Sequence, residues 1–298
     1  MNDTNAHRFL SRKHLVVFGA GYVGGEVARM ARKSGARVTI LTRNPLVAAE
    51  LVAAGCEAVI DHLQNSTWHT KIAQADFVLN SVSGGGRGLD GYRQSYLEGM
   101  HSVLTWGSQS GTAGRLAYTG STSVYPQGGG VEISESDQVA GIDERTNLLV
   151  ETEELVRQWS GPSCVLRLAG IYGPNRHHLL DQLRSGVTDF PGSGDHHLNL
   201  IHRDDAVSAV IAALANMSEV GHRRFNVVDN GRARKKEMVG WLAQQLSLPP
   251  PNFRSNMVSS RRPNPLDRTI SNQLIKAQLD WSPRYPTFKD GYAELLEA

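Results

Sequence analysis

The fold of this 298-residue chain is decided by the stretch Phe18-Gly19-Ala20-Gly21-Tyr22-Val23-Gly24. It follows the apolar run Leu15–Phe18 and opens a segment with helical periodicity, so it is the turn between a strand and a helix. In such a turn the first glycine allows the tight bend, the second lets backbone amides approach a pyrophosphate, and the third lets helix and strand pack closely. The pattern predicts a dinucleotide site, with phosphates at the helix N-terminus, formed by Gly19, Gly21, Tyr22, Val23 and Gly24. A glycine-rich turn without a ligand is the alternative.

Apolar strand-like runs alternate with helical patterns through the first half of the chain. The runs lie at residues 15–18, 38–41, 58–60, 77–79, 115–118 and 164–168, and the last helical pattern between them covers 147–159. Short apolar strands separated by helices are typical of a parallel sheet covered on both faces. We therefore expect an α/β fold with a doubly wound parallel Rossmann sheet.

The pattern loosens after Gly170 and returns only in part. Loops surround one short helix at 178–183, and the sheet pattern is expected to return with a strand at 198–201, a helix at 204–215 and a strand at 225–228. Helical patterns at 235–246 and 272–279 flank a proline- and arginine-rich segment. We expect residues 1–170 and 198–229 to form the NAD(P)-binding domain, and residues 171–197 and 230–298 to form a smaller C-terminal substrate-binding cap.

Composition excludes several classes of function. Lys+Arg 31 against Asp+Glu 29 gives a net charge of +2, so we expect no nucleic-acid partner. Two cysteines rule out a disulfide framework, and the adjacent histidines at 177–178 and 196–197 seldom reach one ion, so we expect no metal site. No apolar run approaches the ~20 residues of a membrane helix. With no secretory signal in residues 1–13, a cytoplasmic protein without a membrane partner is expected.

The end of the second strand indicates which dinucleotide is bound. A carboxylate ~20 residues after the glycine motif would bind the ribose hydroxyls of NAD. Here that position holds Thr42, followed by Arg43. A guanidinium suits a 2′-phosphate, so we expect NADP, with NAD still open and a solvated surface arginine as the alternative. Asp61, after the third strand, is expected near the adenine, and a surface carboxylate is an equal alternative.

Four further segments point to one family. They are Tyr118-Thr119-Gly120-Ser121-Thr122-Ser123-Val124-Tyr125-Pro126, Leu166-Arg167-Leu168-Ala169-Gly170-Ile171-Tyr172-Gly173-Pro174, Ile201-His202-Arg203-Asp204-Asp205-Ala206 and Leu279-Asp280-Trp281-Ser282-Pro283. Together with the glycine motif they resemble, in order, motifs of the extended short-chain dehydrogenase/reductase superfamily, also called the NAD-dependent epimerase/dehydratase family. Asp280 replaces the glycine of the family's terminal Gly-Trp-x-Pro.

The resemblance also shows what is missing. It implies that Ser121 polarises the substrate oxygen and that a Tyr and a Lys on the next helix complete proton transfer. The lysine is needed because a phenol of pKa ~10 is a poor acid at neutral pH without a nearby cation. The family spacing puts these residues at Thr146 and Val150, so the chain resembles atypical members that lack the pair.

Other side chains are candidates for the same region. We expect Tyr125 to be the substitute acid/base; the alternative is that it is only a packed aromatic residue at a strand end. We expect Ser121 to contact substrate or nicotinamide; the alternative is that its hydroxyl only forms a hydrogen bond that fixes the end of the strand. Ser81, after the fourth strand, and Tyr172 are expected at the cofactor.

Arginines and glycines suggest the kind of substrate. The segment Ser83–Gly88, with Arg176, Arg203 and the pair Arg261-Arg262, suggests an anionic or sugar-nucleotide-like small molecule. We therefore expect an NADP-dependent oxidoreductase or epimerase/dehydratase acting on a carbonyl, hydroxyl or sugar-nucleotide-like substrate. The alternative is an NADP(H)-sensing regulator that kept the pocket and lost the proton relay. A homodimer through helices at 92–100 and 147–159 is also expected.

Overall fold

A parallel sheet forms the centre of the computed structural model, which describes residues 8–84, 88–217, 221–257 and 265–297. Within these residues the sheet has seven strands in the order β11-β7-β5-β4-β1-β2-β3. They are β1 (His14–Phe18), β2 (Arg37–Thr42), β3 (Glu57–Ile60), β4 (Phe77–Asn80), β5 (Arg115–Ser121), β7 (Ser163–Leu168) and β11 (His222–Val227). All pairings are parallel, and the order reverses between β1 and β4, which confirms the doubly wound Rossmann fold.

Helices cover both faces of the sheet because side chains alternate along each strand. Leu15 and Val17 join a cluster with α2 (Gly24–Lys33), α3 (Pro45–Ala53) and α8 (Arg203–Asn216). Val16 and Phe18 point to the other face, where they pack with α5 (Gly99–Ser110) and the end of α6 (Glu144–Val156). Every residue of β1 is buried, as expected for a strand covered on both sides.

Three short parallel ladders lie outside the main sheet. They pair β10 (Leu200–His202) with β8 (Gly170–Tyr172), β12 (Asn252–Arg254) with β9 (Asp189–Pro191), and β13 (Arg268–Ile270) with β6 (Val131–Ile133). The expectation that a strand at 198–201 rejoins the main sheet is therefore wrong. The chain leaves that sheet at Ala169, whose amide is the last to bond β11, and β10 follows the departing β8.

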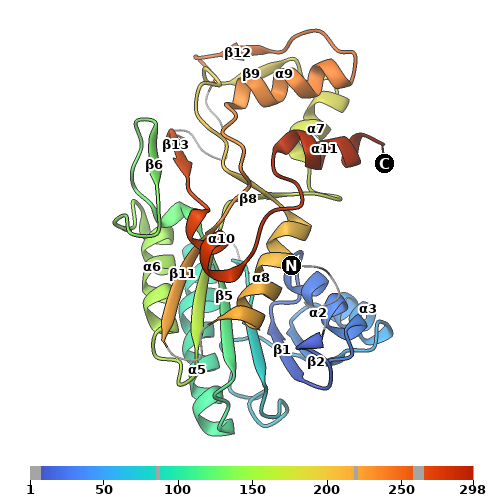
Figure 1. Cartoon of the computed structure of the whole chain (residues 1–298), viewed down its shortest axis with the longest axis vertical. Coiled ribbons are helices and arrows are strands. Elements are labelled where there is room, and N and C mark those ends of the chain that lie inside the picture. Colours follow the sequence, from blue (N-terminus) through green and yellow to red (C-terminus); the bar gives the residue numbers. More distant parts are fainter. Residues whose placement is uncertain (1–7, 85–87, 218–220, 258–264, 298) are drawn as a thin grey trace.

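A separate hydrophobic cluster occupies the other end of the molecule. It joins α7 (His178–Arg184), α9 (Lys235–Gln245) and α11 (Phe288–Glu297), which Figure 1 shows grouped away from the sheet. The helix α10 (Gln273–Leu279) does not belong to this group, because its Ile275 and Leu279 pack in the cluster of the sheet and α8. The C-terminal tail thus crosses between the two ends of the molecule.

Candidate functional site

The glycine turn lies where the strand order reverses. The Gly19 amide donates to Leu41 O of β2 (3.1 Å), and the Ser81 amide after β4 donates to Phe18 O (2.8 Å). Gly19 has φ +85°, and a Cβ on it would lie 2.6 Å from the Val82 nitrogen. A Cβ on Gly24 would lie 2.2 Å from the Gly19 carbonyl oxygen. Both positions therefore require glycine for steric reasons.

The same turn leaves room and donors for a ligand. A Cβ on Gly21 would have no protein atom within 4 Å, so the backbone is open to approach there. Val23, the N-cap residue of α2, gives no side-chain bond to the helix amides. The first amides of a helix need partners, and the helix dipole favours anions at this end. The residues present thus fit the pyrophosphate of a dinucleotide.

Tyr22 connects this turn to the loop after β8. Its hydroxyl donates to Pro174 O (2.8 Å), which brings the first motif of the chain, the glycine turn, together with the third, residues 166–174. The guanidinium carbons of Arg176 and Arg203 lie 5.4 and 5.5 Å from the centre of its ring. Arg203 is balanced by Asp204 (2.8 Å). Two guanidinium groups thus lie beside the glycine turn, one of them paired with a carboxylate.

The residues expected at the adenosine end follow β2 and β3. Thr42 is the buried last residue of β2, and its carbonyl accepts the Asp61 amide (3.2 Å). Arg43 is exposed directly after it. The Asp61 carboxylate accepts bonds from Thr67 (2.5 Å), Asn65 (2.7 Å) and the His62 amide (2.7 Å). Burial opposes ionisation, but these donors outweigh it and lower the Asp61 pKa. Its acceptor capacity is largely used within its own loop.

Ser81 and the segment 121–127 at the end of β5, called the strip below, lie at the same edge of the sheet. The Thr119 hydroxyl donates to Ser81 Oγ (3.2 Å). Ser121, the half-buried last residue of β5, caps the short 3-10 helix η2 (Thr122–Val124). Its Oγ accepts bonds from the Ser123 amide (3.2 Å) and Ser123 Oγ (2.9 Å). Both acceptor positions of Ser121 are occupied, so its proton is left to donate.

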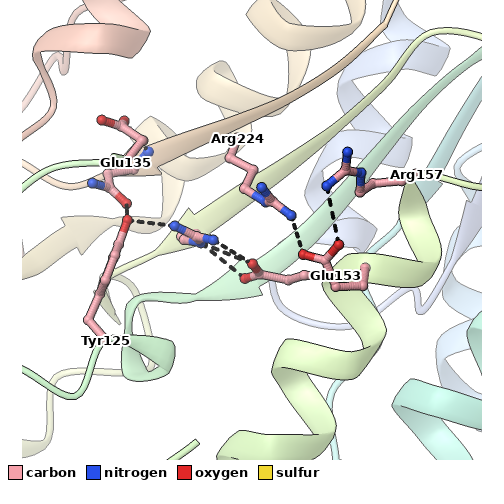
Figure 2. Close-up of polar contacts among 8 residues, drawn as sticks. Tyr125, Glu135, Glu153, Arg157 and Arg224 are labelled. Atoms are coloured by element: carbon pink, nitrogen blue, oxygen red, sulfur yellow. Dashed lines mark hydrogen bonds and ion pairs between the residues drawn. The ribbon is translucent and has the colours of Figure 1, made fainter. Parts of the chain in front are cut away.

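Tyr125 lies in a buried network rather than at an open surface. Its side chain is 0% exposed, and its hydroxyl donates to Asn226 Oδ1 (2.8 Å) and accepts from Arg167 Nη1 (2.7 Å). Arg167, 1% exposed, pairs in turn with the equally buried Glu153 (2.7 Å). Figure 2 shows Tyr125 and Glu153 at opposite ends of this chain of contacts. Burial raises the Tyr125 pKa despite the neighbouring cation, and this geometry favours the packing alternative.

Thr146 and Val150, at the positions where the family has its Tyr and Lys, have structural roles. Thr146 is the third residue of α6, where its hydroxyl accepts the Asp143 amide (3.0 Å) while Asp143 accepts the Thr146 amide (2.7 Å). This reciprocal arrangement is a capping box. Val150 is half-buried and packs against the main cluster. A Tyr-x-x-x-Lys spacing does occur at Tyr285 and Lys289, but there it leads into α11 and lies outside the strip and α6.

Tyr172, which is expected at the cofactor, packs among aromatic residues. It is buried, its ring stacks on Tyr292 (4.8 Å between centroids), and its edge meets His202 (5.3 Å). Burial raises its pKa far above the usual range. Its hydroxyl has no partner among the described residues, and a Cβ on Gly291 would lie 2.1 Å from it. Its contacts are with the end of the molecule that holds α11.

A residue that sequence reasoning missed is Tyr96. The helix expected at 92–100 is instead α4 (Gly88–Tyr92), the π-helical turn η1 (Arg93–Glu98) and the start of α5. The Tyr96 hydroxyl accepts the Gly84 amide (3.2 Å), and its ring lies 5.2 Å from that of Tyr92. Arg145 of α6 lies 5.3 Å from the centre of the Tyr92 ring. Turns of this kind are frequent at functional sites, and the Tyr-x-x-x-Tyr spacing after a glycine-rich segment was the available signal.

The remaining candidates do not form a metal centre. His177 pairs with Asp181 (2.8 Å) and His197 with Asp267 (2.7 Å), and no group of three ligating side chains occurs in the part of the chain that is described. No helix among the described residues is long and apolar enough to cross a membrane. The residues Gly85–Arg87 and the pair Arg261-Arg262, expected at the substrate, lie outside the described residues.

A glycine turn at the switch point of a doubly wound sheet defines a dinucleotide-binding Rossmann protein. Residues 15–228 match the model of the NAD dependent epimerase/dehydratase family. The chain belongs to this family. Membership confirms the resemblance, and with it the expectation of an enzyme of the epimerase/dehydratase type that uses a nicotinamide cofactor. A search of curated proteins found no match.

Solved structures share the fold over nearly the whole chain. The dTDP-glucose 4,6-dehydratase DesIV from Streptomyces venezuelae, with NAD bound, is 18% identical (TM-score 0.81; 95% of this chain, 96% of that one). MoeE5 in complex with UDP-glucuronic acid and NAD is 20% identical (TM-score 0.80; 95% and 98%). The UDP-glucose 4-epimerase from Thermotoga maritima, with UDP-glucose, is 15% identical (TM-score 0.80; 95% and 97%).

Proposed function

We propose that this protein is an NADP-dependent oxidoreductase of the epimerase/dehydratase type that binds its cofactor at the turn Gly19–Gly24. The observation that supports this proposal most is that the Gly21 backbone is open to a ligand beside the start of α2, which no side chain caps. Both lie next to Ser81, where the strand order of the sheet reverses. Glycines that only made a tight turn would not need an open approach together with a helix start that no side chain caps.

The preference for NADP rests on Arg43. It is exposed at the end of β2, no carboxylate stands at Thr42 or Asn44, and the Asp61 carboxylate is bonded within its own loop. A guanidinium binds a phosphate group with paired donors, whereas it gains little from a ribose hydroxyl. NAD remains the alternative cofactor.

The substrate class follows from charge and from the relatives. Arg176 and Arg203 beside Tyr22 suit a ligand with a diphosphate. Among the similar structures, DesIV is a dTDP-glucose 4,6-dehydratase, MoeE5 is in complex with UDP-glucuronic acid, and the Thermotoga maritima protein is a UDP-glucose 4-epimerase. We propose a sugar-nucleotide-like substrate with a hydroxyl or carbonyl group, bound between the sheet domain (1–170 and 198–229) and a cap formed by 171–197 and 230–298, of which α10 packs on the sheet domain. A homodimer through α6 and the helix around η1 is part of the same proposal.

Two hydroxyls are proposed for the chemistry. Ser121 has its proton free to donate to a substrate oxygen. Tyr96 accepts one bond from Gly84, and burial raises its pKa to about 12, so the phenol keeps its proton at neutral pH and acts as a hydrogen-bond donor, not as an acid that ionises. We therefore assign a hydrogen bond to the substrate oxygen to Tyr96 and a bracing role to Tyr125, which the buried network holds. The bound nicotinamide ring would supply or accept the hydride.

The cofactor proposal is tested by titrating the purified protein with NADP, NADPH, NAD and NADH. Arg43→Ala should weaken NADPH binding by about tenfold or more and leave NADH unchanged, because a bond to a charged group contributes roughly 1.5–3 kcal/mol. Arg37→Ala, which removes an exposed arginine paired with Glu57 at the start of the same strand, is the matched control. If the wild type binds none of the four dinucleotides, the proposed function is wrong.

The catalytic assignment is tested with UDP-glucose, UDP-glucuronic acid and dTDP-glucose as substrates. Tyr96→Phe should lower turnover by about 100-fold or more with little change in NADPH affinity, as expected for loss of a hydrogen-bond donor to the reacting oxygen. Ser121→Ala should act in the same direction. Turnover that survives Tyr96→Phe and falls in Tyr125→Phe would return the role to Tyr125.

A second candidate function is an NADP(H)-sensing regulator. It is favoured by the roles of Thr146 and Val150, the two positions where the family has its acid/base pair. Thr146 caps α6, and the Val150 side chain packs against the hydrophobic cluster. It predicts affinities that differ between NADP and NADPH, together with a protein partner gained or lost with the cofactor. Equal affinities and no partner would argue against it.

A further inference from the structure

The C-terminal tail places a buried guanidinium against the strip that carries Ser121. Arg268, in β13, is 9% exposed. Its Nη1 donates to Tyr125 O (2.6 Å) and Gln127 O (2.9 Å), and its Nη2 donates to Thr122 O (3.1 Å). One side chain thus binds three carbonyls within six residues of the strip.

Elsewhere the strip is tied to residues 138–140 at two points, by the Ala140 amide on Val124 O (3.0 Å) and the Gln127 side-chain amide on Gln138 O (2.7 Å), and beyond it the chain is rich in glycine. It continues into Gly128-Gly129-Gly130, and the second and third of these glycines have φ of +78° and +80°. Glycine runs restrict the backbone less than other residues do. The turn η2 is itself only three residues long, and its closing bond from the Tyr125 amide to Thr122 O is long (3.4 Å).

The tail, by contrast, is fixed on several sides. β13 runs parallel to β6, with Arg268 opposite Val131 (Figure 1 shows the two strands side by side). The preceding Asp267 accepts the His197 amide (2.9 Å) and pairs with the His197 ring (2.7 Å). Its carbonyl accepts the Gly130 amide (2.8 Å). Arg268 therefore reaches the strip from an anchored position.

We propose that Arg268 is a positioning residue that holds the Ser121 turn at the carboxyl edge of the sheet, so that the tail completes the candidate active site. A guanidinium is costly to bury, and here its planar donors bind three backbone carbonyls of one loop. Loss of these bonds would release η2 and, with it, the orientation of the Ser121 hydroxyl. The catalytic meaning of this position rests on the proposed role of Ser121.

The test is hydrogen exchange of the full-length protein, read on peptides that cover residues 119–128. Arg268→Met keeps the length of the side chain and removes its donors, so exchange there should rise about tenfold or more while peptides of β1 and β2 stay unchanged. Arg268→Lys keeps the charge with fewer donors and should restore part of the protection. Arg254→Met, which removes an exposed arginine paired with Asp189, is the matched control and should have no effect.

Two results would overturn the proposal. One is unchanged exchange of 119–128 in Arg268→Met; the other is an equal rise in every peptide, which would mean that Arg268 contributes only to global stability. NADPH affinity is measured on the same samples and should be unchanged. A wild type that fails to bind NADPH would refute the proposed function and leave the exchange result, and thus the positioning role, to be judged separately.

Discussion

The two motifs that define this protein use polar groups in opposite ways. At the glycine turn Gly19–Gly24 the amides at the start of α2 have no side-chain cap, and the Gly21 backbone is open. Beneath the strip 121–127 the polar groups are turned inward, where Arg167 is paired with Glu153 and with Tyr125. The first region is built to receive a ligand, and the second is built to be rigid.

This difference indicates which part of the family's chemistry the chain kept. Binding of a pyrophosphate by backbone amides depends on glycines and on strand order, and both are present. Proton transfer depends on side chains, and at Thr146 and Val150 these serve the helix. If the protein is an enzyme as proposed, the hydroxyls that serve the substrate come from neighbouring elements, and Tyr96 on η1 is proposed as one of them.

The largest expected effect lies in the rigid region. Glu153→Ala leaves the Arg167 guanidinium buried without its carboxylate, so the free energy of unfolding in urea should fall by about 3–5 kcal/mol. The neighbouring Glu154 pairs with Arg224 and with Arg157 (3.4 Å) at the surface (Figure 2), and Glu154→Ala should cost about 1 kcal/mol or less. Similar losses in the two variants would contradict a rigid buried network.

A smaller effect is expected at the open region, and on binding instead of stability. In Gly21→Ala the added methyl meets no protein atom, so the melting temperature should hardly change. It occupies the space where a pyrophosphate approaches, so the Kd for NADPH should rise about tenfold or more. Gly240→Ala, also in open space but on α9, is the control and should bind normally. Normal NADPH affinity in Gly21→Ala would place the phosphates elsewhere.

The smallest effect over a single pH unit is a pH dependence from Asp229, which is buried in the loop after β11. Burial raises the pKa of its carboxyl to about 8, and the nearby Asp205 adds to the rise. Between pH about 4 and 8 the folded protein then holds a proton that the unfolded chain has lost, so stability should fall as pH rises, by at most about 1.4 kcal/mol per pH unit. Urea unfolding of Asp229→Asn across this range should show a flatter curve.

The control for that series is Asp137→Asn. The Asp137 carboxylate accepts bonds from Ser134, which lower its pKa, so its titration lies below this window. The Asp137→Asn curve should therefore keep the wild-type slope between pH 4 and 8. An unchanged slope in Asp229→Asn would show that the proton is held elsewhere.

Much of the fold and of the cofactor site could be predicted from local sequence. The turn at 18–24, the strands of the sheet and the strip after β5 are signalled by glycine spacing and short apolar runs, which act through backbone geometry. The strand expected at 198–201 was placed in the wrong sheet, because an apolar run predicts a strand and does not name its partner. The position of Tyr125 in the strip favours a role near the reaction. The sequence cannot reveal that Arg167 and Asn226, which are distant in the chain, enclose its hydroxyl.

The sequence by itself determined that this chain has a dinucleotide-binding fold and lacks the family's usual Tyr and Lys on α6. Both features can be read from residues that are close together in the sequence. Only the tertiary structure decided which polar groups form hydrogen bonds within the protein and which face an open space where a ligand can bind. It joined Arg268 to the strip across more than a hundred residues and turned Tyr96 toward Gly84 on a π-helical turn. The reason is physical: hydrogen bonds between distant segments depend on how the packed elements meet, and no local pattern encodes that meeting.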